Sequence, residues 1–152
     1  MNSILGIFSN LCLWGAVVSW IVAQGLKIPI HALTDHRWDW KYFLSSGGMP
    51  SSHSASAIAV TILVGAKAGW SSSQFAIAVV FAAIVMYDAA GVRRETGRQG
   101  AAINEILSKV MVDGKPISDE ELKEIVGHSP FEVVMGALTG ILVALVLLLC
   151  FG

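Results

Sequence analysis

The sequence predicts an all-α fold, an integral membrane bundle of about four transmembrane helices with a short helical segment in a cytoplasmic loop. Of the 152 residues, 55% are hydrophobic and only 14% are charged, which is too apolar for a soluble domain of this length. The hydrophobic residues collect in runs close to the roughly 20 residues that a helix needs to cross the hydrocarbon. Nearly all ionisable residues lie between these runs, and the length suits a single domain over residues 1–152.

The expected spans are residues 4–26, 54–70, 75–90 and 131–151, of which the second is rich in Ala, Ser and Gly and interrupted only by Lys67. A polar segment over residues 27–49 mixes aromatic and charged residues, as membrane interfaces do. A second one, over residues 91–129, has the pattern of two short helices at 99–111 and 118–127, separated by a turn at Asp113 and Gly114. Cys12 and Cys150 fall inside spans and are interpreted as small apolar residues.

The entrance to the second span reads GGMPSSHSA over residues 47–55. A helix N-terminus offers N–H groups and the positive end of the helix dipole, and glycines let a phosphate approach the backbone. Ser51, Ser52 and His53 are therefore candidates for a phosphate site. Ordinary helix capping by serine and proline is the competing interpretation.

The entrance to the last span repeats this composition, with GHSPFE over residues 127–132. If every run crosses once, the second and fourth spans enter the membrane from the same side, so that His53 and His128 face one cavity. Histidine is costly within hydrocarbon, and a pair at helix entrances favours a functional site. Glu132 either orients His128 or completes a capping box with Ser129, and both roles are compatible.

Positive charge follows the third span, where Arg93, Arg94 and Arg98 lie within six residues. They are either the positive flank of a cytoplasmic loop or a phosphate clamp, and the nearby histidines favour the clamp because guanidinium groups match phosphate oxygens. Lys27 can supply a further cation. Asp88 and Glu95 are an alternative divalent-cation site, but one acidic pair makes a poor ligand set, and we expect no metal or other cofactor.

Five motifs together resemble the divergent branch of the type 2 phosphatidic acid phosphatase family, which is related to acid phosphatases and vanadium-dependent haloperoxidases. They are QGLK at 24–27, GGMPSSHSA at 47–55, VMYDAAGVRR at 85–94, GRQ at 97–99 and LKEIVGHSPFE at 122–132. The chain departs from the main family in four respects. Ser52 replaces a glycine, Glu132 replaces an aspartate, and Leu122 stands where an arginine is usual. No Arg-Pro pair follows Lys27 at the usual distance.

The resemblance implies a two-step phosphomonoesterase that uses no metal. His128 would attack phosphorus, His53 would act as acid and base, and Glu132 would orient His128. The substrate would be a lipid phosphate, for example phosphatidylglycerol phosphate. The residues that would hold its phosphate are Lys27, Ser51, Ser52, Arg93 and Arg94.

Nine of the ten Lys and Arg residues lie in or beside the two polar segments, and Lys67 alone lies on the other side. The positive-inside rule then predicts a multi-pass protein of the plasma or inner membrane, surrounded by membrane lipids, with the site facing the cytoplasm. The net charge of −1 and the lack of a basic tract argue against nucleic-acid binding.

Two GxxxG patterns, at residues 65–69 and 136–140, make a homodimer plausible. A non-catalytic four-helix protein that binds, transports or scaffolds is the alternative function. A transporter would bury ionisable groups near mid-bilayer, whereas this sequence gathers them at one interface.

Overall fold

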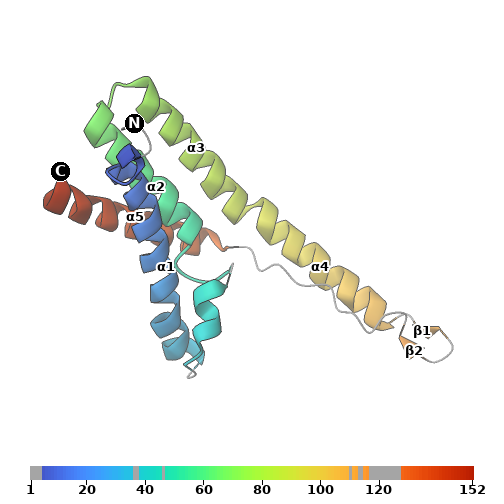
Figure 1. The fold of residues 1–152 in the computed structure, drawn as a ribbon. Helices are drawn as coiled ribbons and strands as arrows, with labels where there is room; N and C mark the ends of the chain where they lie inside the picture. The colour runs from blue at the N-terminus through green and yellow to red at the C-terminus, as the bar shows by residue number, and fades with distance from the viewer. Residues whose placement is uncertain (1–4, 36–37, 46, 110, 113–114, 117–127) are drawn as a thin grey trace.

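The computed structural model describes residues 5–35, 38–45, 47–109, 111–112, 115–116 and 128–152. It confirms a helical membrane bundle (Figure 1). Short 3₁₀ turns and a two-stranded antiparallel ladder, with Met111 opposite Pro116 and Val112 opposite Lys115, complete the described elements. In chain order they are η1 (Leu5–Ile7), α1 (Leu11–Asp35), η2 (Trp40–Leu44), α2 (Ser52–Ala68), α3 (Ser73–Ala90), α4 (Val92–Lys109), β1 (Met111–Val112), β2 (Lys115–Pro116) and α5 (Pro130–Phe151).

The first helix is displaced along the sequence from the expected span at residues 4–26. It begins after Asn10, whose side-chain oxygen accepts from the N–H groups of Cys12 (3.0 Å) and Leu13 (3.3 Å) and so caps the helix. It then continues through Pro29 as far as Asp35, although a proline removes one hydrogen bond from a helix interior. Lys27 and His31 therefore lie on a helix and not in the following loop.

Helix α2 is the centre of the bundle, and α1, α3 and α5 all pack against it (Figure 1). Ala59 and Leu63 of α2 are completely buried and form the core with Ala144 and Leu147 of α5. Small side chains suit a helix that is covered on several sides, because they let neighbouring backbones approach. The same composition makes α2 the least apolar of the four.

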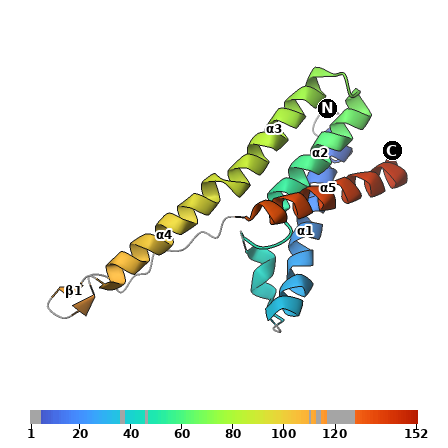
Figure 2. The same cartoon turned by 180° about the vertical axis from the view of Figure 1, so that it is seen from behind.

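Three described helices, α1, α3 and α5, are long and apolar enough to cross a membrane. The expected second span corresponds to α2, whose 17 residues stand at the lower limit for crossing. The two views agree that the N- and C-terminal ends of the chain lie at the same end of the bundle (Figures 1 and 2).

Helices α2 and α5 approach each other closely enough for backbone contact. A Cβ atom on Gly136 would collide with the carbonyl oxygen of Ser51, and one on Gly140 would collide with that of Ala55. This GxxxG pattern is thus used within one chain, and it brings the N-termini of α2 and α5 together. The homodimer stays a prediction, but Gly136 and Gly140 no longer support it because they face α2 of the same chain.

Helix α4 begins at Val92, directly after the residue that caps α3, and so starts well before the expected helix at 99–111. In both views α3 and α4 form one long arm that leaves the bundle and carries β1 and β2 at its far end (Figures 1 and 2). The expected turn at Asp113 and Gly114 and the expected helix at 118–127 lie outside the described residues.

The α2–α5 contact gives a stability prediction. Gly140→Ala should destabilise the protein by about 1–3 kcal/mol, because the new methyl group meets backbone that cannot move aside. Gly25→Ala is the matched control, since nothing lies within 4 Å of its Cβ position and alanine favours a helix. The free energy of unfolding of both variants can be measured in mixed detergent micelles. Equal values for Gly140→Ala and Gly25→Ala would contradict the tight α2–α5 packing.

Candidate active site

Three helix ends meet at one end of the bundle and are joined by backbone hydrogen bonds. The Ser51 N–H, just before α2, donates to the Glu132 carbonyl in the first turn of α5 (3.0 Å). The His128 N–H, just before α5, donates to the Ala89 carbonyl near the end of α3 (3.2 Å). The two helix entrances singled out in the sequence therefore lie side by side, next to the C-terminus of α3.

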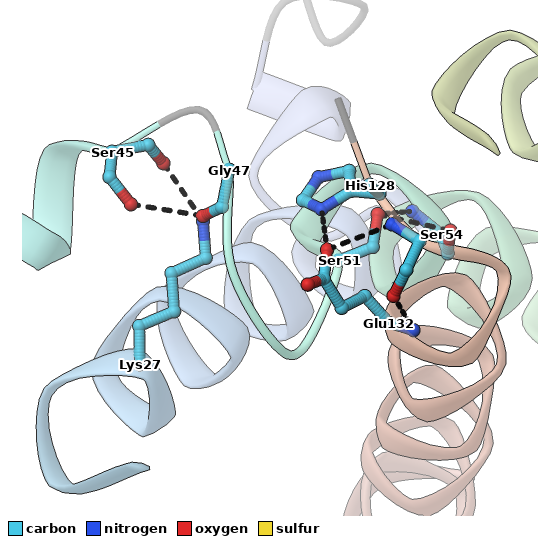
Figure 3. A network of polar contacts seen from close by, with 8 residues as sticks. Lys27, Ser45, Gly47, Ser51, Ser54, His128 and Glu132 are labelled. Carbon is cyan, nitrogen blue, oxygen red and sulfur yellow. Dashed lines mark hydrogen bonds and ion pairs between the residues drawn. The ribbon is translucent and has the colours of Figure 1, made fainter. Parts of the chain in front are cut away.

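His128 is buried, with 1% of its surface exposed. Its Nδ1 lies 3.0 Å from Oε2 of Glu132 (Figure 3). An ionised carboxylate can only accept hydrogen bonds, so Nδ1 carries the ring hydrogen in this contact. The lone pair of the neutral ring is then on Nε2, which is the arrangement that a nucleophilic or basic histidine needs.

Glu132 holds His128 and caps α5 at the same time. The Oε2 that contacts His128 also accepts from the Ser129 N–H (3.1 Å), while the Ser129 hydroxyl accepts from the Glu132 N–H (3.3 Å). Both alternatives drawn from the sequence are present in one geometry. The capping box fixes the carboxylate in place, and the carboxylate fixes the imidazole.

His53 is the second residue of α2 and is partly buried. Its ring centroid lies 6.1 Å from that of His128, and the ring planes are inclined by 62°. The structure thus brings together the two histidines, which are far apart in sequence. Their chemical roles remain predictions.

Ser51 and Ser52 occupy the start of α2, but the Ser51 backbone differs from expectation. The Ser51 hydroxyl caps the helix by accepting from the N–H (3.4 Å) and hydroxyl (3.1 Å) of Ser54. Its own N–H is taken by the Glu132 carbonyl and is not available to a phosphate. Ser52 is the first residue of α2, and the N–H groups of the first helical turn have no acceptor within the helix.

Lys27 is completely buried, and its ammonium donates to the Ser45 carbonyl in the loop before α2 (2.8 Å). Figure 3 shows it reaching toward Ser45 and Gly47, apart from the group around His128. It also attracts the Glu132 carboxylate electrostatically. Lys27 therefore anchors the loop. An ammonium group has three protons, and the Ser45 carbonyl accepts one of them. Contact of the other two with phosphate stays a prediction.

Two further residues of α1 belong to this region, and the sequence interpretation gave them no role. Gln24 is 4% exposed and directs its amide nitrogen at the same Ser45 carbonyl (3.5 Å). His31 stacks on Tyr42, with ring centroids 3.8 Å apart, and its Nε2 would lie 2.8 Å from a Cβ atom on Gly48. The spacing of residues 24, 27 and 31 follows one face of a helix, a signal that is readable once α1 extends beyond Leu26.

Arg93 and Arg94 lie in the first turn of α4, and their side chains are outside the described part of the chain. The residue at position 122, where the main family has arginine, also lies outside it. Glu95 pairs with Arg98 (3.1 Å), which weakens the alternative of a cation site with Asp88. Among the described residues, no group of three His, Cys, Asp or Glu side chains is placed to hold a metal ion.

Comparison with known proteins places the chain in a family. The profile of the Divergent PAP2 family matches residues 8–143. The uncharacterized membrane protein YuiD of Bacillus subtilis (strain 168) is 39% identical over 151 residues, which cover 93% of this chain and 96% of that protein. No solved structure matches. With a match over most of its length, the chain belongs to the Divergent PAP2 family.

Proposed function

We propose that the protein is a membrane-embedded, metal-independent phosphatase that hydrolyses a lipid phosphate monoester through a phosphohistidine intermediate. The observation that carries the proposal is the pair His53 and His128 at adjoining helix entrances, with the Nδ1 of His128 bound to the Glu132 carboxylate. Membership of the Divergent PAP2 family supports the same chemistry.

In the first step, the Nε2 lone pair of His128 attacks phosphorus and the bond from phosphorus to the lipid oxygen breaks. His53 donates a proton to the departing oxygen, so the lipid leaves as an alcohol. Glu132 stabilises the positive charge that His128 acquires, because its carboxylate accepts the Nδ1–H bond throughout.

In the second step, His53 takes a proton from water, and the resulting hydroxide attacks the phosphoryl group. The N–P bond breaks, its electron pair returns to Nε2 of His128, and inorganic phosphate is released. The charge on the equatorial oxygens in both steps needs fixed donors, for which the Ser52 N–H, Lys27, Arg93 and Arg94 are proposed.

A lipid substrate fits the location, because His128 lies between the end of α3 and the start of α5, two helices that are long and apolar enough to cross a membrane. His53, beside it, lies in the first turn of α2. The test is phosphate release by purified protein in mixed micelles, across phosphatidylglycerol phosphate, phosphatidic acid and polyprenyl phosphates. Hydrolysis of at least one lipid phosphate, with chelator present, is expected. If none is hydrolysed, the non-catalytic alternative replaces the phosphatase.

The proposed site faces the cytoplasm, because eight Lys and Arg residues besides Lys27 flank the helix ends on its side and only Lys67 lies on the other. In a background without Cys12 and Cys150, Lys41→Cys should resist a membrane-impermeant thiol reagent in intact cells and react after permeabilisation. Lys67→Cys, at an exposed position near the opposite end of α2, is the matched control and should react in intact cells. The reverse pattern would contradict the orientation.

A further inference from the structure

A groove lined by α1, α2 and α3 runs from His53 along α2 toward the middle of that helix. It has a volume of about 290 Å³ and an almost wholly apolar lining. Its polar end contains Ser52 and His53, and Trp20 of α1 and Phe81 of α3 line its sides. Val60 of α2 and Ala78 of α3 lie farthest from the polar end.

The groove exists because α1 and α3 both pack on α2 and, among the described residues, hardly touch each other. Figure 1 shows α3 diverging from α1 as it runs toward α4, and Figure 2 agrees. Two hydrogen bonds hold the sides in place. The Ser56 hydroxyl donates to the Ala16 carbonyl of α1 (3.0 Å), and the Thr61 hydroxyl donates to the Ala78 carbonyl of α3 (3.1 Å).

The depth of the groove matches one leaflet of a bilayer. From Ser52 to Val60, α2 rises by about 12 Å at 1.5 Å per residue. Half of the hydrocarbon core is about 15 Å thick. A lipid whose phosphate lies at His53 therefore has its first carbons beside the groove, and the volume, at the lower end for ligand sites, suits a single chain.

We propose that this groove binds one hydrocarbon chain of the lipid phosphate substrate, which enters from the membrane between α1 and α3. The inference rests on the proposed phosphatase function and specifies how its substrate is bound. Ser52 and His53 belong both to the groove and to the proposed phosphate site. The groove can therefore hold the hydrocarbon chain of a lipid whose phosphate lies at that site. Burial of the chain orients the phosphate toward His128.

The kinetic test fills the groove. Ala78→Phe should lower the kcat/KM ratio of a long-chain lipid phosphate to a water-soluble short-chain phosphate by about tenfold or more, because only the long chain needs the occupied space. Ala83→Phe is the matched control, since Ala83 is an exposed residue of the same helix and does not line the groove. An unchanged ratio in Ala78→Phe would overturn the groove while leaving the phosphatase function in place.

A second measurement does not depend on turnover. A lipid phosphonate that resists hydrolysis and carries a diazirine in its chain should label Trp20, Val60 or Phe81, and Ala78→Phe should reduce the labelling about tenfold. Labelling of the groove without phosphate release from any lipid would support the groove and overturn the phosphatase. Equal labelling by the corresponding lipid alcohol would show that bulk lipid fills the groove and would overturn the inference.

Discussion

Replacing His128 with alanine is expected to abolish turnover, with a loss of at least about a thousandfold in kcat, together with any phosphorylated enzyme. The reason is geometric. His128 is buried, and its Nδ1 is bound to Glu132, so its Nε2 is the nitrogen oriented for attack. Acid-labile, base-stable phosphate on His128, trapped by rapid quenching, is the expected intermediate.

His53→Ala provides the comparison that separates the two histidines. It should lower turnover of an alkyl phosphate by about 100- to 10,000-fold, because the alkoxide then leaves without a proton. With a good leaving group such as p-nitrophenol, which needs no proton, the phosphoenzyme should still form and should accumulate. Normal activity in His128→Ala would contradict the mechanism, and so would a His53→Ala loss independent of the leaving group.

Folding has to be separated from chemistry in these variants. His128 also joins α5 to α3, but it does so through its backbone N–H, which alanine retains. His128→Asn is a second variant that keeps a polar side chain beside Glu132. The stability of both variants to unfolding in mixed micelles should be close to that of the wild type. Both should lack activity, since neither alanine nor asparagine can form the phosphohistidine.

The bundle and the pairing of its two histidines could be predicted from the sequence because hydrophobic runs alternate with charged segments. If each run crosses once, His53 and His128 must lie at the same interface, and the structure brings their rings within 6.1 Å between centroids. This conclusion depends only on an even number of membrane crossings between the two histidines, and not on the exact helix boundaries. It therefore survives the displacement of α1 along the sequence.

Other features could not be predicted because tertiary contacts override local signals. Pro29 suggests a helix end, yet α1 continues past it and places Lys27 against the loop before α2. The GxxxG pattern at Gly136 and Gly140 suggests a partner chain, but α2 of the same chain occupies that face. Likewise, no local signal assigns the Ser51 N–H to a carbonyl of α5.

Substitutions at Arg93 and Arg94 have the second largest expected effect. The main family resembled by this sequence has an arginine at the position of Leu122, so the proposed mechanism needs another cation to bind phosphate. Their backbone supports this role. The His128 N–H donates to Ala89, and Arg93 follows one helical turn later, at the start of α4. Lysine keeps the charge but loses the two-pronged donor geometry, so Arg→Lys at the position that binds phosphate should lower kcat about 100-fold or more.

Vanadate tests the clamp directly, because its trigonal-bipyramidal form mimics the transition state. It should inhibit the wild type and bind at least one of Arg93→Lys and Arg94→Lys much more weakly, in parallel with the loss of kcat. Arg98→Lys is the matched control, since the Arg98 side chain is 71% exposed and pairs with Glu95, and its activity and vanadate inhibition should resemble those of the wild type. Unchanged vanadate inhibition in both Arg93→Lys and Arg94→Lys would exclude the clamp, and Lys27 and the Ser52 N–H would then be the remaining donors.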